Sequence, residues 1–132
     1  MLNITKTIEY SLIALRHINE NGKDKIFSCK EIASLYNMPK ERLAKILQQL
    51  CKNDYLGTVK GPHGGYFLKK DLKYITLIDF IETLEGPVGV VKCTANLKCN
   101  LIDMCNIKSP INKINSNIRK ILSDVSLQEI TT

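Results

Sequence analysis

The pattern of apolar and polar positions predicts two helices near the start of the chain. Residues 5–19 place apolar side chains at every third or fourth position, the spacing of a helix with one buried face. A short second helix is expected to begin at Ser28. Ser28 and Glu31 have the spacing of a capping box, in which each side chain accepts a hydrogen bond from the backbone of the other residue. The sequence Asn37-Met38-Pro39 ends this helix.

A third helix is predicted to follow at once from Lys40, with an apolar inner face and a polar, basic outer face. Two short helices joined by a turn of about three residues form a helix-turn-helix, whose second helix can enter the major groove of DNA. Any small helical domain with a solvated face shows the same pattern, so these helices alone leave both interpretations open. The inward residues are Leu43, Ile46, Leu47 and Leu50, and the outward residues are Lys40, Glu41, Arg42, Lys45 and Gln49.

Two runs typical of β-strands, residues 55–60 and 65–69, follow the third helix and flank a glycine-rich turn. A hairpin in this position is the wing of a winged helix-turn-helix. Its glycines would let the backbone approach DNA, and Lys60 and His63 would supply charge and hydrogen bonds. A nucleotide-binding glycine loop is excluded, because a strand follows the turn instead of a helix and no Gly-Lys-Ser/Thr sequence occurs.

The second half of the chain predicts two further helices separated by a long loop. Residues 76–85 form the first, and residues 86–108 lack helical or strand periodicity. Ser109 and Pro110 then have the sequence of an N-cap followed by proline at the first helical position. A narrow apolar seam along this last helix suits a partner helix, most simply that of a second copy, although packing within its own chain is the alternative. This C-terminal seam consists of Ile111, Ile114, Ile118, Ile121 and Val125.

Length and charge refine this picture. The 132 residues correspond to one compact unit, and the predicted fold is mostly α with a small β-hairpin wing and a long C-terminal dimerisation helix. All of the net charge of +6 lies in residues 1–75, the expected DNA-binding region, whereas residues 76–132 carry equal numbers of acidic and basic side chains. No apolar run reaches the roughly 20 residues of a membrane helix, and no signal peptide is recognised, so a cytoplasmic protein is expected.

Three of the five cysteines, Cys93, Cys99 and Cys105, lie in the expected loop with five residues between neighbours. Thiolates favour iron–sulfur clusters, zinc or copper(I). Zinc sites usually have Cys-x-x-Cys pairs and four ligands, which are missing here, so the wide spacing favours a cluster with one further ligand from elsewhere. Three unliganded thiols are the alternative. Cys29 and Cys51 lie on predicted helices and are interpreted as structural.

Several motifs occur together in one order: residues 3–10, the turn and helix 38–47, the wing 59–66, residues 75–77 and the three cysteines. With these motifs the chain resembles the Rrf-two-type winged-helix regulators, the family of the IscR and NsrR transcription factors. The resemblance extends from about residue 2 to 128. It implies a homodimer that crosses its C-terminal helices and binds an imperfect palindrome in double-stranded DNA.

The resemblance also implies site residues. Cys93, Cys99 and Cys105 would bind an iron–sulfur cluster, either 2Fe-2S or 4Fe-4S, and Glu9 of the other subunit would be the fourth ligand, as in the NsrR-like branch. Ile107 stands where the IscR-like branch has a histidine, and Lys60 replaces the family's wing arginine. A carboxylate in a first helical turn is also favourable without any metal. The predicted DNA contacts are Lys6, Ser28, Lys30, Lys40, Glu41, Arg42, Lys45, Lys60, His63, Gly64, Gly65 and Tyr66.

The function predicted from these features is that of a transcriptional regulator, specifically a repressor, gated by a cluster that senses nitric oxide, redox state or iron–sulfur status. The alternative is a cluster-free regulator of the same fold that responds to a protein partner or a metabolite of sulfur metabolism. No catalytic residues are predicted, because His17 and His63 have no convergent acid–base partners.

Overall fold

The computed structural model describes residues 4–22, 25–89 and 106–130. These residues confirm the predicted fold class, because they form mostly helices and one antiparallel hairpin. The elements in chain order are α1 (Lys6–Glu20), α2 (Cys29–Leu35), α3 (Lys40–Lys52), β1 (Leu56–Val59), β2 (Gly65–Leu68), the 3-10 helix η1 (Leu72–Tyr74), α4 (Leu77–Glu85), α5 (Lys108–Ser123) and α6 (Leu127–Ile130).

The helix starts follow the predicted local chemistry. The Thr5 hydroxyl caps α1 by accepting from the Ile8 N–H at 3.3 Å. Ser28 and Glu31 form the complete capping box at the start of α2, with N···O distances of 3.1 and 3.4 Å. Asn37 adopts a positive φ of 53°, which turns the chain between α2 and α3. The helix-turn-helix predicted from the sequence is therefore present with its expected boundaries.

The hairpin is joined to the helices by a backbone contact that the sequence did not reveal. Phe27 pairs with Tyr66 of β2 in an isolated bridge, and their N–H and C=O groups exchange hydrogen bonds of 2.8 and 2.7 Å. Phe27 lies just before α2, so the bridge ties the wing to the start of the helix-turn-helix. It thereby fixes the orientation of the hairpin relative to α2.

The core lies where α1, α2 and α3 pack together and includes residues from the end of the chain. Leu15, Leu43 and Leu47 are fully buried, and so is Leu127 of α6. The Leu127 N–H donates to Ile75 O and the Leu77 N–H donates to Val125 O, both at 2.8 Å. After α5 the chain therefore returns to the body of the molecule, an arrangement that the sequence patterns did not predict.

The start of α5 differs from the prediction. Ser109 is not the N-cap: the helix begins at Lys108, and Ile107 occupies the cap position without a side-chain hydrogen bond. Pro110 is consequently the third helical residue and not the first. Proline is tolerated there because the amides of the first turn have no partner within the helix.

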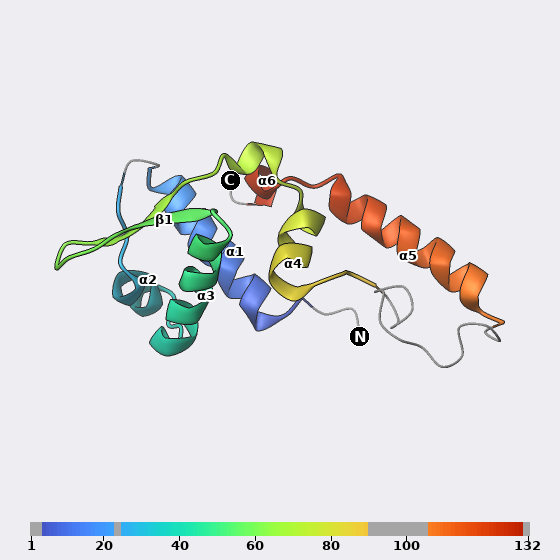
Figure 1. The fold of residues 1–132 in the computed structure, drawn as a ribbon, viewed down its shortest axis with the longest axis horizontal. Helices are drawn as coiled ribbons and strands as arrows, with labels where there is room; N and C mark the ends of the chain where they lie inside the picture. Colours follow the sequence, from blue (N-terminus) through green and yellow to red (C-terminus); the bar gives the residue numbers. More distant parts are fainter. Residues whose placement is uncertain (1–3, 23–24, 90–105, 131–132) are drawn as a thin grey trace.

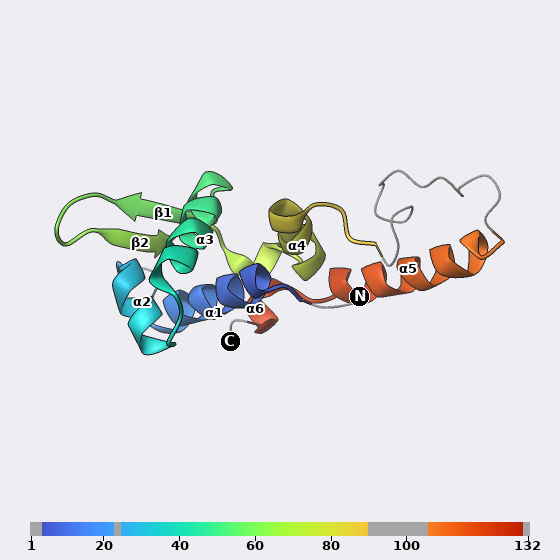
Figure 2. The ribbon, with the colours of Figure 1, turned by 90° about the horizontal axis from the view of Figure 1, so that it is seen from below.

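The wing and α5 extend from opposite ends of the molecule (Figures 1 and 2). Residues 86–89 and 106–107 of the predicted loop 86–108 contain no helix or strand, whereas Lys108 already belongs to α5, and residues 90–105 lie outside the described ranges. Among the described helices, none combines the length and the apolar character needed to span a bilayer.

Candidate functional site

Figure 2 shows α2, α3 and the hairpin together at one end of the molecule, and these elements and the turn residues beside them carry most of the residues predicted to contact DNA, whereas Lys6 begins α1. The side chains on α1, α2 and α3 that were predicted to contact DNA are exposed or half-buried, and Lys60 and His63 of the hairpin are exposed. Exposed cations on a helix-turn-helix and its wing suit the phosphates and groove edges of duplex DNA. The exposed members of the set are Lys6, Lys30, Lys40, Glu41, Arg42, Lys45, Lys60 and His63, and the half-buried members are Ser28, Gly64, Gly65 and Tyr66.

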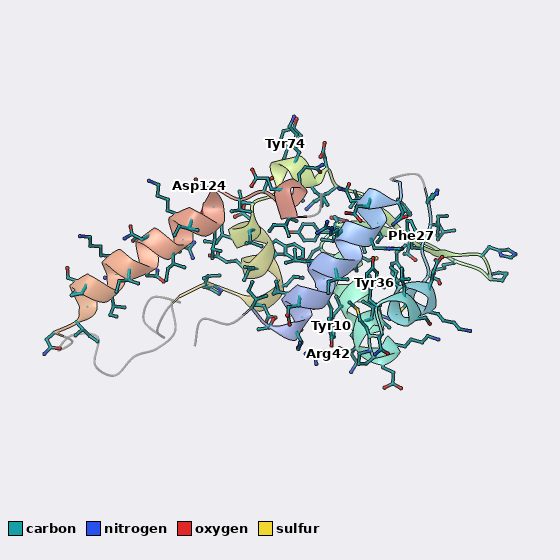
Figure 3. All side chains as sticks on the ribbon, turned by 180° about the vertical axis from the view of Figure 1, so that it is seen from behind. Tyr10, Phe27, Tyr36, Arg42, Tyr74 and Asp124 are labelled. Atoms are coloured by element: carbon teal, nitrogen blue, oxygen red, sulfur yellow. The ribbon has the colours of Figure 1, made fainter. Side chains whose placement is uncertain are left out.

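Arg42 also contacts its own chain. Its guanidinium carbon lies 5.5 Å from the centre of the Tyr10 ring of α1, and Figure 3 shows the two side chains next to each other. The Lys6 ammonium approaches the same ring at 6.0 Å. The contact of Arg42 attaches the first turn of α3 to α1, whereas that of Lys6 lies within α1. The position of Arg42 therefore depends on α1 as well as on α3.

The wing glycines have a packing role in addition to the predicted approach to DNA. A Cβ atom on Gly64 would lie 2.0 Å from the Val59 carbonyl oxygen, and one on Gly65 would lie 2.5 Å from the Phe27 carbonyl oxygen. Both contacts are with backbone, which cannot move aside easily. Any side chain at these two positions would disturb the hairpin itself.

Glu9 lies on an exposed part of α1 and forms an ion pair with Lys6 at 3.2 Å. The other three predicted cluster ligands, Cys93, Cys99 and Cys105, lie outside the described residues. Within the ranges that the structure describes, no group of three or more His, Cys, Asp or Glu side chains could hold a metal ion. The structure thus places Glu9 on an accessible surface of the first helix.

Cys29 and Cys51 are half-buried and pack against the core. The Cys29 thiol donates a hydrogen bond to the Lys40 carbonyl oxygen, with an Sγ···O distance of 3.6 Å, and so joins the starts of α2 and α3. Burial raises the pKa of both thiols above the ordinary value, which disfavours the reactive thiolate. These properties fit the structural role expected for the two residues.

The two histidines occupy different environments. His17 is buried, with Nδ1 2.9 Å from the Tyr36 hydroxyl and its ring edge-on to Phe27. His63 is exposed on the wing. His17 therefore acts as a hydrogen-bonded core residue between α1, the end of α2 and Phe27.

The residues of the C-terminal seam have different environments. Ile114 and Ile121 are 47% and 64% exposed on α5, whereas Val125 packs against the core of its own chain. Ile118 lines an apolar pocket of about 370 Å³ between the start of α1, the end of α4 and α5. Only part of the seam is therefore open to a second copy. The pocket is lined by Ile4, Thr5, Ile8, Ile81, Glu85, Gly86, Pro87, Val88, Gly89, Ile118 and Leu122.

Arg119 of α5 connects this helix to α4 and to Val88, which follows α4 in the chain. The sequence indicated only that Arg119 lies beside the C-terminal seam. Arg119 forms an ion pair with Glu82 of α4 and donates a hydrogen bond to the Val88 carbonyl oxygen at 3.0 Å. A second polar link, from the Thr5 hydroxyl to Glu85 at 2.6 Å, joins α1 to α4. No spacing rule connects residues this far apart, so the sequence carried no signal for either contact.

The fold and the exposed basic surface define a winged helix-turn-helix DNA-binding protein. The family described as iron-dependent transcriptional regulator, Rrf2, matches residues 4–132, and the chain belongs to this family. The HTH-type transcriptional regulator NsrR of Bacillus licheniformis is 29% identical over 131 residues, covering 98% of this chain and 92% of that protein.

Solved structures share the fold. The global cysteine regulator CymR of B. subtilis has a TM-score of 0.79 at 21% identity, covering 99% of this chain and 97% of that chain. IscR of T. potens has a TM-score of 0.73 at 23% identity, covering 98% and 85%. The family establishes the chain as a transcriptional regulator, and these structures share its winged-helix fold.

Proposed function

We propose that this protein is a homodimeric repressor, acting in the cytoplasm, whose DNA binding is gated by an iron–sulfur cluster. The observation that carries the proposal is the trio Cys93, Cys99 and Cys105 in a chain of a family described as iron-dependent. The donor set fits such a cluster, because thiolates are its usual ligands and a carboxylate can complete the coordination of one iron.

Glu9 of the second subunit would supply that carboxylate. Its ion pair with Lys6 is on the surface, and breaking such a pair costs at most about 1 kcal/mol. Glu9 can therefore exchange Lys6 for a metal ion at little cost. A bound cluster would supply an iron centre that reacts with nitric oxide or oxygen, and the carboxylate would be its weakest attachment.

Coupling to DNA would follow from the position of Glu9 on α1. Residues of α1 pack against α3, and Tyr10, the neighbour of Glu9, contacts Arg42. A bond from Glu9 to the other subunit would restrict the spacing of the two recognition helices, which must match half-sites about 34–36 Å apart on the palindrome. Loss of the bond would release that restriction and change the affinity for DNA.

The test compares cysteine variants after anaerobic reconstitution with ferrous iron and sulfide. Cys93→Ala, Cys99→Ala and Cys105→Ala are expected to lose the visible absorbance and the bound iron. Cys29→Ala and Cys51→Ala, matched in chemistry but half-buried against the core, should retain both. A DNA duplex is first selected from a random library with the full-length protein. The affinity of the protein for this duplex is then measured with and without the cluster, and before and after addition of nitric oxide.

A cluster-free regulator is the second candidate, favoured by the likeness in fold to a protein described as a global cysteine regulator. Wild-type protein that stays colourless and iron-free under anaerobic reconstitution would support this candidate and exclude the first. Its DNA affinity would then be measured against cysteine and related thiols as effectors.

A further inference from the structure

We propose that Arg119 is a positioning residue: it holds Val88, which precedes the cysteine-bearing residues 90–105, against α5. The evidence is a set of contacts among described residues. The Arg119 Nη1 group donates to the Val88 carbonyl oxygen at 3.0 Å, two residues before this segment begins, and the same nitrogen pairs with Glu82 of α4. The consequence for a cluster rests on the proposed function, but the contact itself does not.

The helix that carries Arg119, α5, also follows the cysteine-bearing residues directly in the chain. Residue 105 is followed after two residues by Lys108, the first residue of α5. Arg119 lies eleven positions further along α5, which corresponds to about 16 Å of helix. The same helix thus holds Lys108 as its first residue and Val88 through the hydrogen bond of Arg119.

The end of α4 also determines the direction of the chain from Gly86 to Val88. Gly86 ends α4 with a φ of 90°, a conformation that other residues rarely adopt, and the chain then runs to Val88. Glu82, one turn before Gly86, orients the guanidinium that binds Val88. The side chains of Arg119 and Glu82 are only 38% and 30% exposed, so water screens the pair less than it screens the surface pair of Lys6 and Glu9.

Arginine is suited to this task because its planar guanidinium can serve a carboxylate and a carbonyl at once in fixed directions. A lysine would keep the charge but would lose the fork geometry. Order that Arg119 already imposes on Val88 need not be imposed when a ligand binds beside it, so less conformational entropy is lost on binding. Arg119 should therefore increase the retention of a metal cluster without touching it.

The contact is tested first in the cluster-free full-length protein by hydrogen exchange. Arg119→Ala is expected to speed exchange of the Gly86 amide, which donates to the Glu82 carbonyl oxygen at 2.9 Å just before Val88, and Glu82→Gln should do so to a smaller extent. Lys120→Ala, the neighbouring exposed cation, is the matched control and should leave exchange unchanged. Unaltered exchange in Arg119→Ala would overturn the proposed role. Thermal unfolding of each variant identifies general destabilisation, and Arg119→Lys serves if the alanine variant does not fold.

The second test measures the release of iron from the anaerobically reconstituted protein to a chelator. We expect release from Arg119→Ala to be faster by roughly threefold to tenfold, an intermediate rate for Arg119→Lys, and the wild-type rate for Lys120→Ala. Equal rates in Arg119→Ala and wild type would overturn the role in cluster retention. If the wild-type protein takes up no iron, the proposed function fails, while the exchange experiment still decides whether Arg119 positions the segment.

Discussion

Glu9 occupies a position where two physical effects favour a carboxylate. In the first turn of α1 it is stabilised by the partial positive charge of the helix terminus, and it pairs with Lys6 at 3.2 Å. Neither effect requires a metal. A substitution that removes the charge and keeps the shape can therefore separate a ligand from a carboxylate that only stabilises its helix.

Glu9→Gln is predicted to leave a cluster that assembles on the three cysteines but has an altered visible spectrum and an altered reaction rate with nitric oxide. The amide is a much poorer ligand for iron than the carboxylate. Stability should change by no more than about 2 kcal/mol, because only a surface ion pair and a helix-dipole interaction are lost. Anaerobic absorbance spectra and nitric oxide titrations measure the first two effects, and thermal unfolding measures the third.

Glu20→Gln is the matched control, since Glu20 also forms an exposed ion pair within α1, with Arg16 at 2.8 Å. This variant should resemble wild type in spectrum and reactivity. If Glu9→Gln also resembled wild type in both, Glu9 would not be a ligand.

The DNA contacts proposed for the wing depend on its attachment to the helices. Its two strands are four residues each, and an isolated hairpin of this size is only marginally stable. The bridge between Phe27 and Tyr66 and the close packing of Gly65 against Phe27 attach it to the start of α2. The cations of the wing are thereby presented together with those of α3.

Lys60→Ala is predicted to weaken DNA binding and to reduce the salt dependence of the binding constant. Each phosphate contact contributes about −0.9 to the slope of log K against log salt, so the loss of one contact should reduce the slope by about that amount. Fluorescence anisotropy with the selected duplex at several salt concentrations gives both values. Lys73→Ala in η1 removes the same charge away from the wing and should leave the slope near the wild-type value. An unchanged slope in Lys60→Ala would remove this residue from the DNA interface.

At the scale of the whole molecule, α5 extends away from the body on the side opposite the wing (Figure 1). Ile114 and Ile121 remain exposed on this helix, whereas Ile118 faces the pocket within its own chain. A second copy that covered Ile114 and Ile121 would remove apolar surface from water at roughly 25 cal/mol per Å². It would also place two DNA-binding surfaces in one particle.

Ile121→Glu is predicted to convert the proposed dimer to a monomer, because the change would place a charge in an apolar interface, which costs several kcal/mol. Sedimentation velocity or light scattering determines the mass. Leu35→Glu is the control: Leu35 is 61% exposed, close to the 64% of Ile121, but lies on α2. A dimeric Ile121→Glu protein would place the interface elsewhere. A monomeric Leu35→Glu protein would place it on the helix-turn-helix.

The features predicted correctly from the sequence are those decided by residues within a few positions of one another. The capping box of Ser28 and Glu31, the inward face of α3 and the strands around the glycine-rich turn all follow from local hydrogen bonds and from the periods of helix and strand. Even there a terminus can be misplaced. Ser109 and Pro110 had a favourable cap sequence, yet α5 begins one residue before Ser109.

The features that the sequence could not predict depend on which distant segments meet. Leu127 is fully buried and bonds to Ile75, Phe27 pairs with Tyr66, and Arg119 connects Glu82 to Val88. Each contact joins residues separated by tens of positions, where no periodicity applies. The division of the C-terminal seam has the same origin, because helical spacing places five apolar side chains in one row but does not say what each will face. Only the packing of α5 against α4 decides that Ile118 lies half-buried beside the pocket while Ile114 and Ile121 stay exposed.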